Sequence, residues 1–143
     1  MPRASGNNPC VERVTHSKIT VSEKGKSLTI INDSRDEYDL VNVDGCLVKD
    51  GPRADWIISK PDDVSAVVEL KGRDVGHAVD QIFATLSNPR CENYLAGNVK
   101  LVIVCAKYPS FDTKVAKAQV RAKKSGASLK VICRALECRI GEL

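Results

Sequence analysis

Three charged residues, Asp55, Glu69 and Lys71, have the types and spacing that metal-assisted chemistry on a phosphate requires. Glu69 and Lys71 stand two positions apart at the end of an apolar run, so in a strand their side chains point to the same face. Asp55 precedes them across a short hairpin that can bring it alongside. Carboxylates of this kind hold Mg²⁺, which polarises a phosphate and lowers the pKa of a bound water, while an ammonium group offsets developing charge. The trio therefore predicts hydrolysis of a phosphodiester bond with Mg²⁺ or Mn²⁺ as cofactor.

The segments around these residues predict a mixed sheet flanked by helices. After Gly72 the alternation of the strands gives way to a helical period over residues 74–86, with Asp74 as the N-cap. The other predicted elements are strands at 38–48, 53–59, 64–70, 99–106 and 128–134, and a helix from 111 or 112 to 125. The order from residue 40, β-β-β-α-β-α-β, belongs to the α/β (α+β) class.

The N-terminal part of the chain has a different character. Residues 1–10 are rich in Pro, Gly, Asn and Ser and predict a disordered leader, followed by a single domain over residues 11–143. Residues 18–22 and 27–31 are rich in β-branched residues and flank Gly25, which predicts a β-hairpin. A short helix is one reading of residues 11–14, and their pattern leaves it undecided.

The central arrangement resembles the PD-(D/E)xK nuclease superfamily, in which an Asp and a later (Asp/Glu)-x-Lys motif occupy adjacent strands. The matching residues are Asp55, Glu69 and Lys71, and Gln81 fits a Gln that several branches place one helix length after the Lys. The resemblance covers about residues 40–134. It implies a restriction-endonuclease-like sheet, metal ligation by Asp55 and Glu69, and catalytic roles for these two residues together with Lys71 and Gln81.

The acidic residues leave alternatives open. The superfamily often has a further acid on a helix before the first core strand, where this chain offers only Glu12. Asp44 interrupts the first core strand, either as part of a bulge or as an additional carboxylate near the metal. Asp62 or Asp63 is an alternative first acid, but both fall in a predicted turn, which favours Asp55.

Positive charge gathers in the C-terminal third. The 143 residues include 22 basic and 18 acidic residues, for a net charge of +4, and residues 112–139 hold eight of the basic and two of the acidic ones. Such a segment suits a polyanion partner, although an ordinary solvated face is the alternative. The predicted nucleic-acid contacts are Arg73 and His77 near the motif, and Lys114, Lys117, Arg121 and Lys124 in one stripe of the second helix.

Three hypotheses follow for the activity. The first is a metal-dependent nuclease acting on nucleic acid, DNA rather than RNA. The second is a catalytically inactive module of the same fold that binds nucleic acid or a partner protein. The third is a small protein in which the charged trio forms a surface ion network. Members of the superfamily often act as dimers or within larger complexes, so a homodimer or larger assembly is compatible with the first two.

The six cysteines bear on the compartment. Cys46, Cys105 and Cys133 lie inside apolar strand-like runs, so we expect small buried thiols rather than disulfides, and a cytoplasmic location. No Cys-x-x-Cys pair is present, which leaves a structural zinc site with little support. The longest apolar run is far shorter than the roughly 20 residues that span a bilayer, and no secretory signal is visible, so we expect no membrane association.

Overall fold

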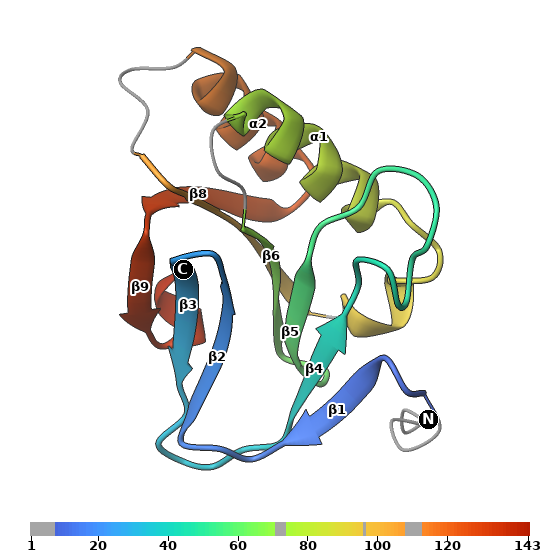
Figure 1. The fold of residues 1–143 in the computed structure, drawn as a ribbon, viewed down its shortest axis with the longest axis vertical. Helices are drawn as coiled ribbons and strands as arrows, with labels where there is room; N and C mark the ends of the chain where they lie inside the picture. The colour runs from blue at the N-terminus through green and yellow to red at the C-terminus, as the bar shows by residue number, and fades with distance from the viewer. Residues whose placement is uncertain (1–7, 71–73, 96, 108–112) are drawn as a thin grey trace.

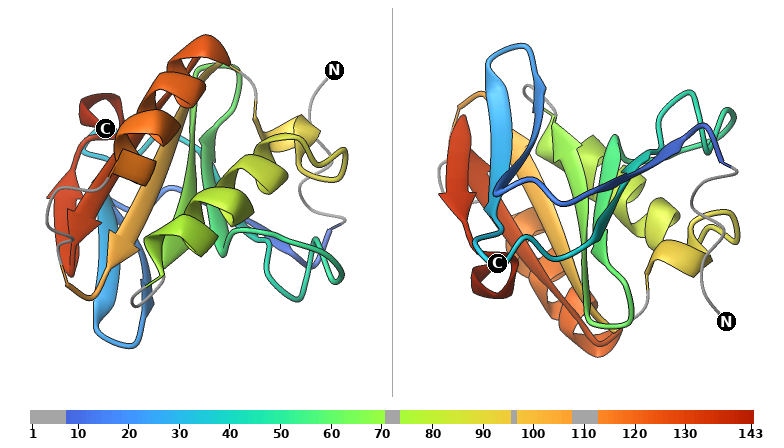
Figure 2. Two further views of the ribbon diagram at one scale, coloured as in Figure 1. Left: turned by 90° about the horizontal axis from the view of Figure 1, so that it is seen from above. Right: turned by 90° about the horizontal axis from the view of Figure 1, so that it is seen from below.

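Three layers make up the computed structural model, which describes residues 8–70, 74–95, 97–107 and 113–143 (Figure 1). A six-stranded sheet lies in the middle. Two helices cover one of its faces, and a three-stranded sheet covers the other (Figure 2). This arrangement confirms the predicted mixed sheet with helices packed on it.

The six-stranded sheet has the order β1-β4-β5-β6-β7-β8. Its strands are β1 (Val11–Val14), β4 (Tyr38–Asn42), β5 (Trp56–Lys60), β6 (Val64–Leu70), β7 (Asn98–Cys105) and β8 (Ala127–Cys133). The pairs from β1 to β6 are antiparallel, whereas β6, β7 and β8 are parallel. Parallel neighbours need crossover connections, and α1 (Val75–Leu86) and α2 (Thr113–Lys124) supply them on one face.

The smaller sheet is built on the predicted hairpin. Strands β2 (Lys18–Glu23) and β3 (Lys26–Ile31) pair antiparallel, and Lys24 and Gly25 between them have φ angles of 47° and 80°. Two successive positive φ angles are typical of the tight turns that match the twist of a hairpin. Strand β9 (Ala135–Cys138) adds to β3 in parallel, and the short helices η2 (Glu92–Tyr94) and η3 (Ile140–Glu142) complete the described elements.

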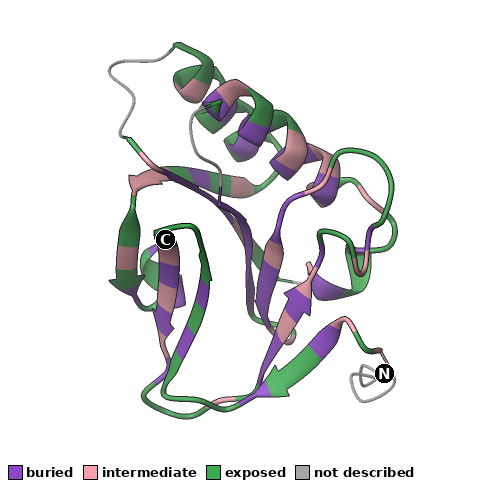
Figure 3. Cartoon of the chain, viewed as in Figure 1, coloured by how far each residue is buried: buried purple, intermediate pink, exposed green. Residues whose placement is uncertain are grey.

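Strand β6 is the centre of both cores. All seven of its residues are buried, and successive side chains point to opposite faces. Val67 packs with Leu101 under the helices, whereas Val68 packs with Val102 against the smaller sheet. The buried segments run through the middle of the molecule in Figure 3. The continuous apolar run of β6 thus reflects a strand covered on both sides.

The predicted boundaries differ from the structure at the first core strands. Residues 11–14 are strand β1 and not a helix. The strand predicted over 38–48 ends at Asn42, because residues 43–48 form a turn. Gly45 in this turn has a φ of 76°, and the Val48 N–H donates a hydrogen bond to the Val43 carbonyl (2.9 Å). The next strand begins at Trp56 rather than at residue 53.

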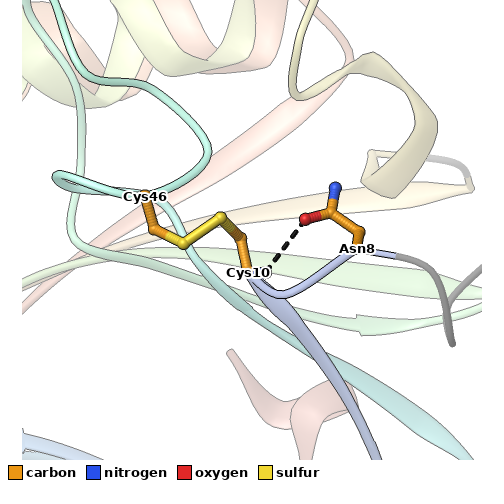
Figure 4. Close-up of a disulfide and its surroundings, with 3 residues drawn as sticks. All are labelled: Asn8, Cys10 and Cys46. Atoms are coloured by element: carbon orange, nitrogen blue, oxygen red, sulfur yellow. Dashed lines mark hydrogen bonds between the residues drawn. A yellow bond between two sulfur atoms is a disulfide. The ribbon is translucent and has the colours of Figure 1, made fainter.

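The structure corrects the expectation for the cysteines. Cys10 and Cys46 form a disulfide, with their Cα atoms 5.6 Å apart (Figure 4). Pairing of β1 with β4 places Cys10 beside Asn42, whose N–H donates to the Cys10 carbonyl (2.8 Å), and the turn after β4 returns Cys46 to the same place. The contact joins residues 36 positions apart, so local pattern did not reveal it. Cys10 and Cys46 are therefore oxidised, contrary to the reduced cysteines from which we expected a cytoplasmic location.

The predicted leader lies largely outside the described residues. Its end is structured: Asn8 Oδ1 accepts a hydrogen bond from Cys10 N–H (2.9 Å), and the Asn8 carbonyl accepts one from Val11 N–H (3.1 Å). These bonds and the disulfide attach residues 8–10 to the domain. Over the described ranges, neither helix is long and apolar enough to cross a membrane.

Candidate active site

Asp55 and Glu69 lie side by side at one end of the β5–β6 hairpin. The last register pair of the two strands is Trp56 with Val68, and the Asp55 N–H donates to the Val68 carbonyl (3.1 Å). The Asp55 carboxylate then accepts the N–H of Leu70 through Oδ2 (2.8 Å). This bond holds the carboxylate against the final two residues of β6, as the spacing predicted.

Both carboxylates belong to the face of the sheet that the helices cover. Side chains alternate along a strand, and Ile57 and Val67, two positions from Asp55 and Glu69, pack in the core under the helices. Asp55 is 8% exposed and Glu69 is 0% exposed. Burying ionised carboxylates costs free energy unless cations or hydrogen bonds compensate. A site with two such groups on adjacent strands suits a cation.

Thr85 of α1 holds the backbone that leads into Asp55. Its hydroxyl oxygen accepts the N–H of Ala54 (2.6 Å), and the hydroxyl donates to the Gln81 carbonyl one turn earlier in the helix (2.9 Å). Thr85 and Ala54 are both fully buried. Sequence reasoning missed Thr85, since a single Thr in an amphipathic helix carries no signal that a distant amide needs an acceptor.

On the other side, the Asp55 carbonyl is held by the turn after β4. It accepts hydrogen bonds from the N–H groups of Val43 (3.0 Å) and Asp44 (3.4 Å). The Asp44 side chain is half exposed and its Oδ1 bonds Arg53 Nε (2.8 Å). Asp44 therefore supports the site through its backbone, while its carboxylate is engaged by Arg53.

Gln81 presents a polar atom that suits a site. Its Oε1 is buried, and none of the residues that the structure describes hydrogen-bonds it. Buried polar atoms are nearly always paired, so an orphan of this kind calls for an explanation. A donor such as a metal-bound water or a substrate group would supply the missing bond.

The other predicted acids lie elsewhere. Asp62 and Asp63 occupy the β5–β6 turn, at the opposite end of β6 from Glu69, and Asp63 Oδ2 is paired with Lys60 (3.3 Å). Glu12 is exposed on edge strand β1, which β4 and β5 separate from β6. Asp55 is thus the acid that the fold brings beside Glu69. Lys71 and Arg73 fall outside the described residues.

A cleft between α1 and α2 gathers most of the predicted nucleic-acid contacts. Its volume is about 480 Å³, and its lining includes His77 of α1 with Lys114, Lys117 and Arg121 of α2. All four of these residues are exposed. The cleft lies beside the first turn of α1, where Asp74 Oδ1 caps the helix by accepting the His77 N–H (2.9 Å). Lys124 continues the stripe along α2 beyond the residues that line the cleft.

The cleft is shaped by close contacts between the helices. A Cβ on Gly76 would lie 3.1 Å from Lys114 Nζ and 3.3 Å from its Cδ, so glycine makes room for the lysine over the first turn of α1. The Arg121 guanidinium lies 4.1 Å from the centroid of the Phe83 ring, within cation–π range. Asp74 and Asp80 also line the cleft, so three cations face two carboxylates there. The excess of positive charge is modest.

The described residues supply two of the ligands that a metal would need. Among them, no group of three or more His, Cys, Asp or Glu side chains could hold an ion. Mg²⁺ is commonly bound through one or two carboxylates and keeps several waters. Asp55 and Glu69 fit that pattern by type and position. Comparison of the chain with protein-family models, curated proteins and solved structures found no match.

Proposed function

We propose that this protein is a metal-dependent nuclease with a restriction-endonuclease-like core, acting on DNA in preference to RNA. The observation that carries the proposal is the placement of two buried carboxylates, Asp55 and Glu69, on one face at the end of β6. The chain continues from there into α1, whose first turn borders the basic cleft. The carboxylates suited to a divalent cation, at the end of β6, are thus followed along the chain by the helix that borders the phosphate-binding cleft.

In this proposal, some residues bind the metal and others contact the substrate or the attacking water. Asp55 and Glu69 would hold Mg²⁺ or Mn²⁺, which when bound polarises the scissile phosphate and activates a water. In this proposal Lys71 offsets charge that develops on the phosphate. Gln81 Oε1 accepts a hydrogen bond from the attacking water and so orients it. Arg73 adds a further contact to the phosphates.

The cleft would hold the nucleic-acid backbone. Lys114, Lys117 and Arg121 contact phosphates without reading bases, so they set affinity and its salt dependence rather than sequence choice. His77 lines the same cleft, and Lys124 continues this surface along α2. Because Asp74 and Asp80 share the cleft, the binding it provides is modest, and a second copy or a larger complex would strengthen it.

A second candidate is an inactive module that binds nucleic acid or a partner protein. Two observations favour it: Glu69 is completely buried, and the described residues form no three-ligand group. An enzyme must admit water and substrate to its metal, whereas a binding module keeps the carboxylates as a structural remnant. The two candidates differ in turnover and share the basic cleft.

The decisive experiment follows cleavage of labelled duplex DNA, single-stranded DNA and RNA with Mg²⁺, Mn²⁺ or EDTA. The variants are Glu69→Gln and Lys71→Ala, and the control is Asp63→Asn, which removes an acid at the far end of β6. We expect metal-dependent cutting that both variants abolish and the control retains. Binding of nucleic acid without cutting, by a protein that still binds Mn²⁺, would support the inactive module. Absence of cutting, of metal binding and of nucleic-acid binding would leave the trio as an ion network and reject both proposals for the site.

A further inference from the structure

Cys105 and Cys133 face each other at the end of two parallel strands. They are the final register pair of β7 and β8, and no disulfide joins them. Paired residues of neighbouring strands lie about 4.8 Å apart, within the range of about 4.4–6.8 Å that a disulfide bridges between Cα atoms. Register partners also point to the same face of the sheet, so the two thiols share one side.

Each thiol donates a hydrogen bond to a carbonyl of the neighbouring strand or of the residue directly after it. Cys105 Sγ donates to the Ile132 carbonyl of β8 (3.3 Å), and Cys133 Sγ donates to the carbonyl of Ala106, directly after β7 (3.8 Å). The same Ala106 carbonyl accepts Arg134 Nε (3.4 Å), so two side chains of the β8–β9 segment bond the end of β7.

The two thiols differ in access. Cys133 is partly exposed, whereas Cys105 is 1% exposed. Burial, with a smaller contribution from neighbouring Cys133, raises the pKa of the Cys105 thiol. A partly exposed thiol and a buried thiol beside it match the usual pair of attacking and resolving cysteines.

We propose that Cys105 and Cys133 are a reactive dithiol that closes into a second disulfide by exchange with a low-molecular-weight disulfide such as glutathione disulfide. The Cys133 thiolate attacks one sulfur of that disulfide, forming a mixed disulfide and releasing one small thiol. Cys105 then loses its proton and attacks the Cys133 sulfur, forming the internal bond and releasing the second small thiol. Two protein thiols are oxidised, one small disulfide is reduced to two thiols, and the two protein protons end on those products. This site is independent of the proposed nuclease.

The test is disulfide mapping of the folded full chain after treatment with glutathione disulfide. Free thiols are blocked with N-ethylmaleimide, and unreduced peptides are identified by mass spectrometry. In the wild type we expect the Cys105 and Cys133 peptides to be linked, beside the Cys10–Cys46 bond. Cys133→Ser should prevent any new bond. Cys105→Ala should leave Cys133 carrying a stable glutathione adduct, because the resolving thiol is gone.

The remaining cysteines provide the controls. Burial raises the pKa of the Cys91 thiol to about 11, so this residue should stay reduced throughout. Cys138 belongs to β9 of the smaller sheet and packs in the core between the two sheets, and Cys138→Ala should leave closure unchanged. A persistent adduct on Cys133 in the wild type, no reaction at either residue, or bonds shared equally with Cys91 or Cys138 would overturn the proposal.

Discussion

The two ends of the β5–β6 hairpin handle negative charge in opposite ways. At the turn, the Lys60 ammonium lies between Asp36 Oδ2 (3.0 Å) and Asp63 Oδ2 (3.3 Å), and all three side chains are about a third or more exposed. At the other end, Asp55 and Glu69 are buried on the face under the helices. Water screens the first group, so its energy is small. The second group lies where electrostatic interactions are strong and a missing partner is costly.

Under the proposed function, this contrast separates a structural use of charge from a chemical one. An exposed ion pair tolerates substitution, because solvent takes over the interactions of either partner. Buried carboxylates attract a bound cation strongly, because little water screens the interaction. They depend, however, on the surrounding backbone to hold them in position. The hydrogen bonds from Leu70, Val43 and Asp44 to Asp55 supply this positioning. Substitutions at the two ends should therefore have very different effects.

The largest difference is expected for metal binding and cleavage. Asp55→Asn removes a charged ligand while keeping the size of the side chain and an oxygen that still accepts the Leu70 N–H. We expect weakening of Mn²⁺ binding by at least about 10-fold and of cleavage by at least about 100-fold. Asp63→Asn, at the exposed end, should stay within about twofold of the wild type in both measurements. Equal effects of the two variants would contradict the assignment of the site to the buried end.

A smaller effect, on stability, is expected at Thr85. Thr85→Val keeps the shape of the side chain but leaves the buried Ala54 N–H without its acceptor, and the cost should be about 2 kcal/mol in the free energy of unfolding. Thr85→Ser keeps the hydroxyl and should cost less than about 1 kcal/mol. Urea denaturation of both variants measures the difference.

An exposed threonine pair provides the matched control for that experiment. Thr20 and Thr29 share a hydrogen bond between their hydroxyl oxygens (2.8 Å) on the surface of the β2–β3 hairpin. Because water can replace this bond, Thr20→Val should change stability by less than about 0.5 kcal/mol. If Thr85→Val costs no more than Thr20→Val, the bond to Ala54 does not hold the site.

The smallest effect is expected at the exposed charge cluster. Hydrogen bonding to Asp36, followed by that to Asp63, raises the pKa of Lys60 above its ordinary value. A raised pKa means that the folded state holds this proton more tightly, so the stabilisation is present at neutral pH and is lost as the pH rises through that pKa. Lys60→Gln should lower the free energy of unfolding by less than about 1 kcal/mol at pH 7, and by less still in high salt.

Urea denaturation at two salt concentrations, at neutral and strongly alkaline pH, tests this expectation. Lys49→Gln is the control: Lys49 is an exposed loop residue, so this variant measures the general effect on stability of losing one positive charge. The difference between the two variants should shrink with salt and disappear at alkaline pH. A difference that persists under both conditions would show that Lys60 acts through packing rather than charge.

Some features of the protein are set by the sequence alone, because they depend on neighbours along the chain. Alternation and β-branched residues predict the β2–β3 hairpin, and a continuous apolar run predicts the doubly covered strand β6. The helical period after Asp74, together with its capping side chain, predicts α1. A hairpin of fixed register also brings Asp55 alongside Glu69. Each of these inferences needs only the geometry of a strand, a turn or a helix.

Other features were decided only by the tertiary structure. The Cys10–Cys46 disulfide depends on the pairing of β1 with β4, and the acceptor for Ala54 comes from Thr85, 31 residues later. The cleft arises where α2 crosses beside α1, which turns a stripe of lysines into one wall of a cavity. The facing thiols of Cys105 and Cys133 follow from the register of β7 and β8. Contacts between distant segments depend on how whole elements pack, and no local pattern encodes that packing.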